Sequence, residues 1–429
     1  MKTVHIIGAG VSGLGAAHYL AERGIECVIH EASEGIGGRA AGRMEGDILF
    51  EVGGKNFSSQ WSRFNALLTS FGIGEFDPQH PDFHLVLNNQ LLKMDKSRTL
   101  KGDLRLGLRL GIRGSLQLKN FLSYSRKHAD ELNHSNGLIE EVEKRWDHKP
   151  VAGHFAPSLL AGPIRMFTII MGAAEPGEVY PSLLMLFTSG FGKGRHFAVR
   201  GGIQRFHQAL ARNKQIRFGE SVKRIAIADG KVTGLEIDTG ECVQTIATDA
   251  VISAVPAHVF KRLVDLPAAA QQACEEIRYF PLAMINASYD RPVFRDGINS
   301  IMFDPGSVLG HCSANRLYHP EQVRFTLSGA EARKVLHLPD DELISLAEAE
   351  FSRYLPITGN RVKACVTRHM GGICAYAPYF SRVKSTLLAG VETIGGLEIA
   401  GDYLEGHTME GCLHSAELAA RRLQQYLAQ

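Results

Sequence analysis

A glycine-rich turn close to the N-terminus restricts the possible folds of this chain more than any other stretch. Residues 3–7 predict a short apolar strand, residues 14–23 a helix, and residues 25–30 a second strand that closes on Glu31. The turn between the first strand and the helix reads Gly8-Ala9-Gly10-Val11-Ser12-Gly13. A G-x-G-x-x-G turn between a strand and a helix, with an acid about 20 residues further on, is typical of a dinucleotide-binding βαβ unit.

The residue types of this turn have physical roles in binding a dinucleotide. The first glycine permits the tight turn, the second lets the backbone approach a pyrophosphate, and the third lets the helix pack on the strand. The helix N-terminus offers free N–H groups and a positive dipole end to the phosphates, and Glu31 is placed to accept hydrogen bonds from ribose hydroxyls. The alternative is a plain βαβ unit with incidental glycines. The binding residues predicted here are Gly8, Gly10, Ser12, Gly13 and Glu31.

The composition is that of a large globular protein and excludes several classes. The 429 residues are 45% hydrophobic and 21% charged, enough for two or three domains with a large core, which excludes disordered, fibrous and disulfide-stapled chains. Lys and Arg number 47 and Asp and Glu 45, so we expect no nucleic-acid partner. The seven cysteines form no C-x-x-C pair, and no leader or membrane-spanning stretch is visible. We therefore expect a soluble, cytoplasmic protein with reduced thiols and no metal site.

Further motifs extend the pattern beyond the first turn. Gly37-Gly38-Arg39 follows the second strand, and a later apolar strand ends in Gly53-Gly54. The amides of the glycines at 37 and 38, with the neighbouring guanidinium, form a second anion cradle beside the first. Near the other end of the chain, a strand runs into Gly401-Asp402, and Met409-Glu410-Gly411-Cys412 begins a helix. A bare NAD-binding domain would leave these later motifs without a role.

This combination resembles the flavin-containing amine oxidase superfamily, in which E-A-x-x-x-x-G-G-R follows the first glycine turn and binds FAD. Ser221-Val222-Lys223-Arg224-Ile225 is similar to the family strand whose valine backbone meets the adenine, and residues 249–256 are similar to its return strand. The resemblance implies FAD as the cofactor and a helix N-terminus at Met409 that stabilises negative charge on the reduced flavin. The FAD contacts that it implies are Gly38, Arg39, Gly53, Gly54, Val222, Gly401, Asp402 and Met409.

The resemblance also implies the fold. We expect an α/β protein with a discontinuous, Rossmann-like FAD-binding domain and an inserted α+β substrate domain, as in amine-oxidase-like two-domain flavoproteins. The FAD-binding domain is predicted to comprise residues 1–76, 198–262 and 385–429. The substrate domain is predicted to comprise residues 77–197 and 263–384.

The sequence assigns no catalytic side chain. Many members of the superfamily carry a lysine that holds a water at flavin N5, but residues 278–292 contain no lysine. In this respect, and in Arg200-Gly201-Gly202-Ile203-Gln204, the chain resembles the branch of protoporphyrinogen oxidases and carotenoid desaturases. Some members attach FAD through a cysteine, but Cys374 is displaced by one residue from that position, so we expect noncovalent FAD. We expect Lys55 to be solvated, and His369 and Tyr376 to be hydrogen-bonded polar residues rather than flavin contacts.

The middle of the chain carries two unusual stretches. Residues 93–127 hold ten Lys and Arg against two Asp. Their alternation with leucines suits a strand, whereas the i+4 spacing of the arginines and the family resemblance favour a helix. We interpret this basic face as solvated, with an anionic lipid surface or an acidic substrate as alternative partners. Residues 158–174 and 181–191 are strongly apolar, which predicts core helices that can also wall a pocket.

The resulting hypothesis is an FAD-dependent oxidoreductase. It would remove a hydride from a C–H bond next to a nitrogen or a π-system of an apolar small molecule, form a double bond, and pass the electrons to O2 or a quinone. One alternative is an amine or amino-acid oxidase that releases peroxide. A second alternative is a redox-silent FAD-binding module.

Overall fold

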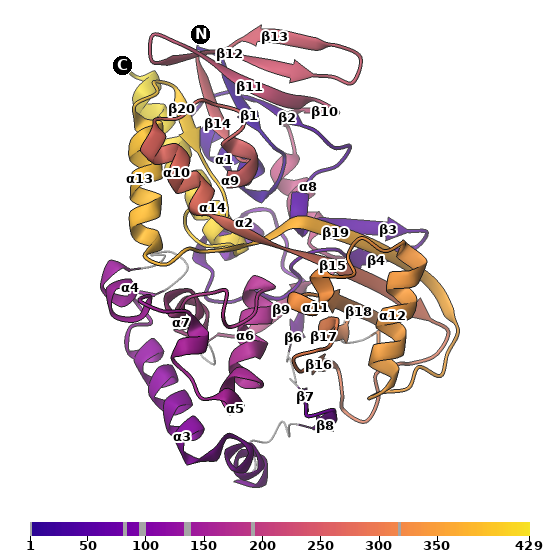
Figure 1. The fold of residues 1–429 in the computed structure, drawn as a ribbon. Coiled ribbons are helices and arrows are strands. Elements are labelled where there is room, and N and C mark those ends of the chain that lie inside the picture. Colours follow the sequence, from indigo (N-terminus) through magenta and orange to yellow (C-terminus); the bar gives the residue numbers. More distant parts are fainter. Residues whose placement is uncertain (1, 80–83, 94–99, 133–138, 190–193, 316–318) are drawn as a thin grey trace.

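The structure is a computed structural model of the 429-residue chain, and it describes every residue except 1, 80–83, 94–99, 133–138, 190–193 and 316–318 (Figure 1). Both termini lie in the upper part of Figure 1, beside a parallel sheet. A second, larger sheet and a group of helices form the lower part.

A five-stranded parallel sheet forms the centre of the upper part. Its strand order is β10-β2-β1-β14-β20, and every neighbouring pair is parallel. The strands come from distant parts of the chain: β1 (Val4–Ile7), β2 (Val28–Glu31), β10 (Gln215–Phe218), β14 (Ala250–Ser253) and β20 (Leu397–Ile399). β1 and β14 are buried along their whole length, as expected for central strands that helices cover on both faces.

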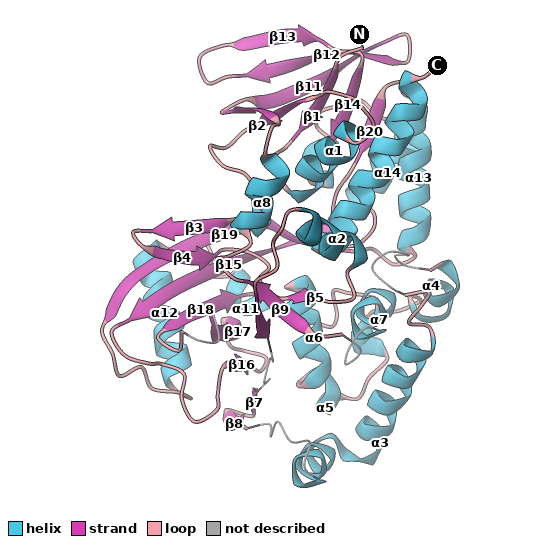
Figure 2. Ribbon diagram, turned by 180° about the vertical axis from the view of Figure 1, so that it is seen from behind, coloured by secondary structure: helices cyan, strands magenta, loops and turns pink. Residues whose placement is uncertain are grey.

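Helices cover the two faces of this sheet. Figure 2, the view from behind, shows α1 (Val11–Ala21), α14 (Met409–Leu427), α2 (Ser62–Ser70) and α8 (Gln204–Ala211). In Figure 1, α9 (Ala257–Phe260), α10 (Ala268–Glu276) and α13 (Phe380–Glu392) lie nearer the viewer. α1 and α14 pack so closely that a Cβ atom on Gly15 would lie 3.0 Å from the side chain of Leu413. This close packing fixes the N-termini of both helices at one edge of the sheet.

An antiparallel sheet of three strands extends the upper part, and two small sheets lie lower, near β15 and β19 (Figure 2). The three strands are β11 (Ser221–Ala228), β12 (Lys231–Asp238) and β13 (Val243–Ala247). The turn that joins β11 to β12 has positive φ at Asp229 (50°) and Gly230 (70°), as the sequence suggests for an Asp-Gly turn. The small sheets consist of β3 (Gly42–Glu45) with β4 (Ile48–Glu51), and of β5 (Phe57–Ser58), β9 (His196–Val199) and β6 (Phe76–Gln79).

A seven-stranded sheet of order β19-β15-β18-β17-β16-β7-β8 dominates the lower part. Its strands are β7 (His84–Leu87), β8 (Gln90–Leu92), β15 (Arg278–Tyr289), β16 (Ser300–Met302), β17 (Leu309–Ala314), β18 (Gln322–Leu327) and β19 (Arg361–Ala375). The pairs are antiparallel except that of β16 with β7. The long strands β15 and β19 reach up to the parallel sheet, while α11 (Ala330–Arg333) and α12 (Asp340–Ser352) lie on the outer side (Figure 1).

Five helices complete the lower part: α3 (Leu100–Lys127), α4 (Glu140–Trp146), α5 (Pro157–Leu160), α6 (Pro163–Gly172) and α7 (Pro181–Ser189). The helical interpretation of the basic stretch is confirmed over α3, with a break at Gly111, whose φ of 69° and ψ of 171° are not helical. The core prediction for the apolar stretches is also confirmed, since α7 is buried along its whole length and α6 over most of it.

The predicted fold class is confirmed. All strands of the parallel sheet fall within the three segments predicted for the FAD-binding domain, and all strands of the seven-stranded sheet fall within the two predicted for the substrate domain. The boundaries themselves stay predictions. All seven cysteines are free thiols. Among the described residues, no helix combines the length and apolar character needed to cross a bilayer.

Candidate functional site

Two glycines of the first turn have opposite surroundings. A Cβ atom on Gly13 would overlap the carbonyl oxygen of Gly8 and lie 3.0 Å from its carbonyl carbon, so α1 requires glycine there. A Cβ atom on Gly10 would meet no atom within 4 Å. Gly10 is the N-cap of α1 and has φ of −73° and ψ of −178°, a conformation open to any residue. The open space at Gly10 therefore lies at the helix N-terminus, where the sequence predicts a pyrophosphate.

Glu31, at the end of β2, holds this turn in place. Its Oε2 accepts a hydrogen bond from the Ala9 amide at 2.7 Å, and its Oε1 accepts one from the Ser33 amide at 2.9 Å. Oε1 also accepts from the Ser33 hydroxyl at 2.7 Å, so it is Oε2 that has a further lone pair for a ribose hydroxyl. The carbonyl of Glu31 accepts from the Glu220 amide at 3.0 Å, which brings the start of β11, with Val222, beside β2.

The second glycine cluster lies directly against the first. The Gly37 amide donates to the carbonyl of Ala9 at 2.9 Å. Gly37 and Gly38 have φ values of 98° and 56°, the left-handed region that favours glycine. A Cβ atom on Gly38 would lie 3.4 Å from the Cα atom of Gly10. The predicted second anion cradle is therefore continuous with the first.

Arg39 and Asp402 form an ion pair that joins the N-terminal and C-terminal motifs. Arg39 Nη1 lies 2.9 Å from Asp402 Oδ2 and donates to the carbonyl of Gly372 at 3.0 Å. The Tyr279 hydroxyl donates to Asp402 Oδ1 at 3.1 Å. Burial alone would lower the pKa of Arg39, but the Asp402 carboxylate raises it above its ordinary value. Arg39 is therefore a permanent cation with a fixed position beside the glycines.

The second glycine pair shows the same contrast as the first turn. A Cβ atom on Gly53 would overlap the carbonyl oxygen of Arg39 and lie 2.6 Å from the Cα atom of Ala40. A Cβ atom on Gly54 would meet nothing within 4 Å. Close packing therefore requires glycine at 53, whereas position 54 borders open space.

The C-terminal motif places a second helix N-terminus in the same region. Met409 is the buried first residue of α14, and the Thr408 side chain caps the helix by accepting from the Gly411 amide at 3.1 Å. The Gly401 amide donates to Ser415 Oγ at 3.0 Å, which ties the Gly401-Asp402 turn to α14. Ser12 is buried on α1, and burial raises the pKa of the Cys412 thiol on α14 to about 12.

The structure thus brings the predicted residues together. Contacts link the first turn to Glu31, the first glycine cluster to the second, Arg39 to both Gly53 and Asp402, and α1 to α14. The residues joined in this way are Gly8, Gly10, Ser12, Gly13, Glu31, Gly38, Arg39, Gly53, Gly54, Gly401, Asp402 and Met409, with Val222 alongside. Open space at two glycines, an acid, a cation and two helix N-termini fit a dinucleotide with phosphates near Gly10. Their binding role stays a prediction.

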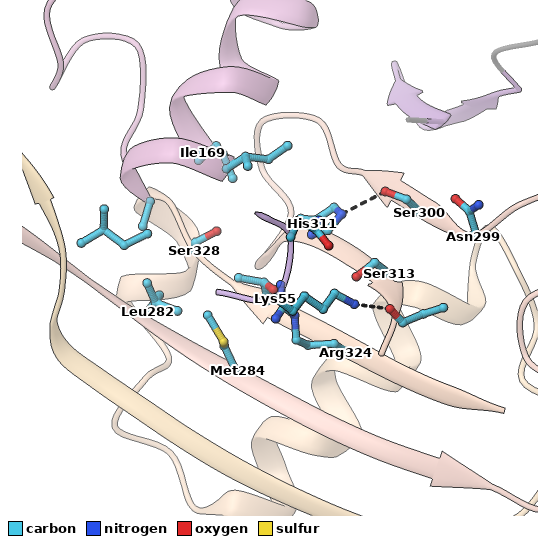
Figure 3. A pocket seen from close by; sticks show the side chains of 16 residues that line it. Lys55, Ile169, Leu282, Met284, Asn299, Ser300, His311, Ser313, Arg324 and Ser328 are labelled. Atoms are coloured by element: carbon cyan, nitrogen blue, oxygen red, sulfur yellow. Dashed lines mark hydrogen bonds between the residues drawn. The ribbon is translucent and has the colours of Figure 1, made fainter. Parts of the chain in front are cut away.

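A pocket of about 130 Å³ begins immediately after the second glycine pair (Figure 3). Lys55 and Asn56, which follow Gly54, line it, as does Ile373, whose neighbour Gly372 accepts from Arg39. α6 contributes part of the wall, so the apolar stretch around residue 169 is both core and pocket lining. The apolar lining residues are Ile169, Ile170, Ala173, Leu282, Met284, Ala314 and Ile373.

Two buried cations also line the pocket. The expectation that Lys55 is solvated is wrong: the side chain is 5% exposed, and Nζ donates to the carbonyls of Ala314 and Asn315, because the chain after Gly54 runs against the end of β17. Arg324 on β18 is 8% exposed and donates from Nη1 to the carbonyl of Gly53 at 2.6 Å. Burial lowers the pKa of Arg324 to about 10, which still leaves it charged at neutral pH.

His311 is a third polar residue of the lining. Its Nε2 lies 2.9 Å from the Ser300 hydroxyl. Burial, with help from the charges of Arg324 and Lys55, lowers the pKa of His311 to about 3, so the ring is neutral. Sequence reasoning missed Arg324, His311 and the role of Tyr279. For Arg324 the signal was a lone charge inside the apolar run Val-Arg-Phe-Thr-Leu over 323–327.

His369 and Tyr376 are hydrogen-bonded to the backbone, as expected. His369 Nε2 lies 2.8 Å from the carbonyl oxygen of Val52. The Tyr376 hydroxyl donates to the carbonyl oxygen of Asp402 at 2.6 Å and is buried. Both side chains therefore stabilise segments that carry predicted binding residues.

Comparison with known proteins identifies the class. Residues 11–424 match the family model of flavin-containing amine oxidoreductases. The 15-cis-phytoene desaturase of Solanum lycopersicum is 22% identical over 98% of this chain and 77% of its own length. The hydroxysqualene dehydroxylase of Rhodopseudomonas palustris is 24% identical over 98% of this chain and 97% of its own length. The crystal structure of a protein titled putative protoporphyrinogen oxidase, from Exiguobacterium sp. 255-15, superposes with a TM-score of 0.73 at 17% identity, covering 100% of this chain and 99% of that one.

The chain belongs to the flavin-containing amine oxidoreductase family. The family implies a flavin cofactor and an oxidoreductase activity, which confirms the corresponding predictions. The resemblance to the family branch that includes desaturases and protoporphyrinogen oxidases is also confirmed.

Proposed function

We propose that the protein binds FAD noncovalently and oxidises an apolar small molecule by removing a hydride from an activated C–H bond. The substrate would lose a hydride and a proton and gain a double bond, and O2 or a quinone would receive the two electrons. The observation that carries this proposal is the pocket after Gly54, which has apolar side chains at seven of its sixteen lining positions and adjoins the predicted flavin-binding segments.

The residues that would hold FAD follow from the open space and the polar groups around it. Gly10 and the N-terminus of α1 would receive the pyrophosphate, Glu31 the adenosine ribose, and Gly54 and the N-terminus of α14 the flavin end. When bound, the flavin supplies the two-electron acceptor for the substrate hydride. Arg39, held by Asp402, would add positive charge beside the phosphates.

Noncovalent attachment is supported by the state of Cys374. The side chain is fully buried, and burial raises the pKa of its thiol well above the ordinary value. A thiolate is the nucleophilic form of cysteine, so a thiol with a raised pKa is a poor candidate for a covalent bond to the cofactor.

A primary-amine oxidase is less well supported than an oxidase or desaturase of an apolar substrate. Amines of this class are cations at neutral pH, and the pocket is lined by two cations, Lys55 and Arg324. None of the described residues that line the pocket is acidic. Like charges in a poorly solvated site repel by several kcal/mol at close range, so an ammonium group would be excluded.

The proposed function is tested by the visible spectrum of the purified protein during anaerobic reduction and re-admission of air. We expect a yellow protein whose absorbance near 450 nm bleaches on reduction, and whose flavin is released as FAD by acid precipitation. If the absorbance returns rapidly in air, the protein is an oxidase. If it returns slowly in air but rapidly when a quinone is added, the protein is a dehydrogenase. A colourless protein that does not take up FAD would contradict the proposal, and a flavin that no apolar substrate reduces would favour the redox-silent alternative.

We also propose that α3 rests on an anionic membrane surface. Ile112 and Leu116 are 84% and 54% exposed and lie four residues apart, on one side of the helix after the break at Gly111. The basic residues Arg113 and Lys119 are exposed on the same segment, which suits anionic headgroups. We expect sedimentation with phosphatidylglycerol-containing vesicles but not with pure phosphatidylcholine vesicles, and loss of sedimentation in an Ile112→Asp, Leu116→Asp variant. Equal sedimentation of this variant would contradict the proposal.

A further inference from the structure

Two cations, Lys55 and Arg324, line the pocket after Gly54, and none of the described lining residues is acidic. The buried carboxylate of Glu51 acts on Arg324 from outside the lining, and its Oε1 already accepts a hydrogen bond from the Ile203 amide at 3.1 Å. Buried charges of this kind are costly unless an opposite charge approaches them.

The same pocket contains buried hydrogen-bond donors that have no acceptor. Within the described part of the chain, Arg324 Nε and the hydroxyls of Ser313 and Ser328 have no hydrogen-bond partner, and all three residues line the pocket. Arg324 is 8% exposed, Ser313 8% and Ser328 1%. Buried polar groups without a partner are rare in folded proteins, and each one calls for an explanation. With the Thr326 hydroxyl, which also lines the pocket without a partner among the described residues, four such groups point to a ligand that supplies acceptors.

The arrangement of these groups divides the pocket into two ends. Figure 3 draws the side chains of Lys55, Arg324 and Ser313 next to one another, with Leu282, Met284 and Ser328 on the side away from Ser313. The effect of both cations on His311 agrees with this placement, because their charges reach one ring. The pocket therefore offers a cationic end, where Arg324 and Ser313 are the donors, and a mostly apolar end that contains the Ser328 hydroxyl.

We propose that this pocket binds the carboxylate of an amphipathic substrate, with Arg324 as the principal donor and Lys55 as a second positive charge. The apolar end would hold the hydrocarbon part of the substrate near Leu282, which lies against Gly372, the residue whose carbonyl accepts from Arg39. The carboxylate would then fix which carbon of the substrate lies at the predicted flavin position. Arg324 would act as a specificity-determining residue, since its Nη1 holds Gly53 in place and its Nε meets the substrate. This proposal rests on the proposed function, because it takes the pocket to be the substrate site.

The first experiment compares three probes of equal chain length on the purified wild-type protein: octanoate, 1-octanol and octylamine. Titration calorimetry measures their binding without any redox step. Charge-assisted hydrogen bonds contribute more than neutral ones, so we expect octanoate to bind at least about tenfold more tightly than 1-octanol, a difference of about 1.4 kcal/mol. Octylamine should bind more weakly than 1-octanol. Equal binding of octanoate and 1-octanol, or tighter binding of octylamine, would overturn the proposal.

Variants then identify the residue responsible. Arg324→Met removes the charge and keeps an apolar side chain of similar length, while Arg324→Lys keeps the charge and loses the planar group. We expect octanoate affinity to fall about tenfold or more in Arg324→Met and less in Arg324→Lys, with 1-octanol affinity changed less than threefold in both. Arg353→Met is the matched control, since this arginine is half-exposed on the surface after α12 and pairs with Glu350. It should leave the binding of both probes unchanged.

A merely structural role of Arg324, through its bond to Gly53, makes a different prediction. In that case Arg324→Met would lose affinity for octanoate and for 1-octanol to the same degree. Arg324→Lys would then not restore the preference for octanoate over 1-octanol. This result would overturn the proposal. If Arg324→Met does not fold, Lys55→Met and the wild-type probe comparison decide the question. The proposed function fails by a separate criterion: no apolar substrate reduces the bound flavin. This result does not depend on the order of affinities of the three probes.

Discussion

Substitution of Gly10 tests the assignment of the first turn most directly, because the structure predicts opposite effects on folding and on cofactor binding. A Cβ atom at position 10 would meet no protein atom within 4 Å, and the backbone there is extended. Gly10→Val should therefore fold. Valine reduces the entropy of the unfolded chain but is a poorer N-cap than glycine, so the stability of the apoprotein should stay within about 1 kcal/mol of wild type.

Cofactor binding should respond in the opposite way. The two methyl groups of valine would occupy the space in which the backbone must approach the pyrophosphate. At FAD concentrations 100 times the wild-type dissociation constant, bound cofactor stabilises the wild-type protein by about 2.7 kcal/mol, and Gly10→Val should lose this whole increment. The matched control is Gly13→Ala, in which the new Cβ would overlap the Gly8 carbonyl oxygen. That variant should be destabilised by several kcal/mol with or without FAD.

The assay is a pair of thermal melts, with and without added FAD, together with the flavin content of each protein as purified. We expect a melting temperature that rises with FAD for wild type only, and an apoprotein melt for Gly10→Val that matches wild type. Stoichiometric flavin in Gly10→Val would refute the placement of the pyrophosphate. A Gly10→Val apoprotein that melts as early as Gly13→Ala would refute the claim that the space at position 10 is open.

Three further predictions concern stability. Asp402→Asn removes the charge partner of Arg39. We expect the free energy of unfolding, measured with urea, to fall by about 2 kcal/mol, and the purified protein to retain less flavin. An unchanged free energy of unfolding would contradict the structural role of the ion pair. His207 is fully buried, and neither ring nitrogen has a hydrogen-bond partner among the described residues. His207→Leu should therefore raise the free energy of unfolding by about 1 kcal/mol. A lower free energy of unfolding in this variant would contradict the prediction. Burial lowers the pKa values of His5 and His407 to about 4 in the folded protein. In the unfolded chain both imidazoles take up a proton below about pH 6.5. The free energy of unfolding should therefore fall as the pH drops from 6.5 to 4. Urea midpoints at half-unit pH steps check this trend, and midpoints that stay level or rise over the window would contradict it.

The first turn could be predicted from the sequence because its determinants are local. Gly8, Gly10 and Gly13 lie within six residues: Gly8 has a φ of 99°, position 10 borders open space, and a Cβ atom on Gly13 would overlap the Gly8 carbonyl oxygen. The strands and helices on either side follow from short-range hydrophobic pattern alone. The same locality explains why Met409 could be placed at a helix N-terminus.

The pocket after Gly54 could not be predicted in this way. Lys55, His311 and Arg324 meet only because the chain after Gly54 runs against β17 and because β17 pairs with β18. No local pattern specifies that pairing, and lysine after a glycine turn is more often exposed. The burial of Lys55 is therefore a product of tertiary packing, and the sequence reading that favoured solvent failed for that reason. Arg324 carried a signal in its apolar neighbours, but the signal does not say which cavity the side chain lines.

The strand order of the parallel sheet has a consequence for protein synthesis. β14 pairs with β1 on one side and with β20 on the other, so its second edge stays uncovered until residues 397–399 have been made. α14 follows only after that and packs on α1, nearly four hundred residues earlier in the chain. Such long-range pairing slows folding. Until the last helix has been translated, the nascent chain carries an unfinished parallel sheet with an exposed edge that favours aggregation, so chaperone dependence should rise sharply in truncations that lack β20.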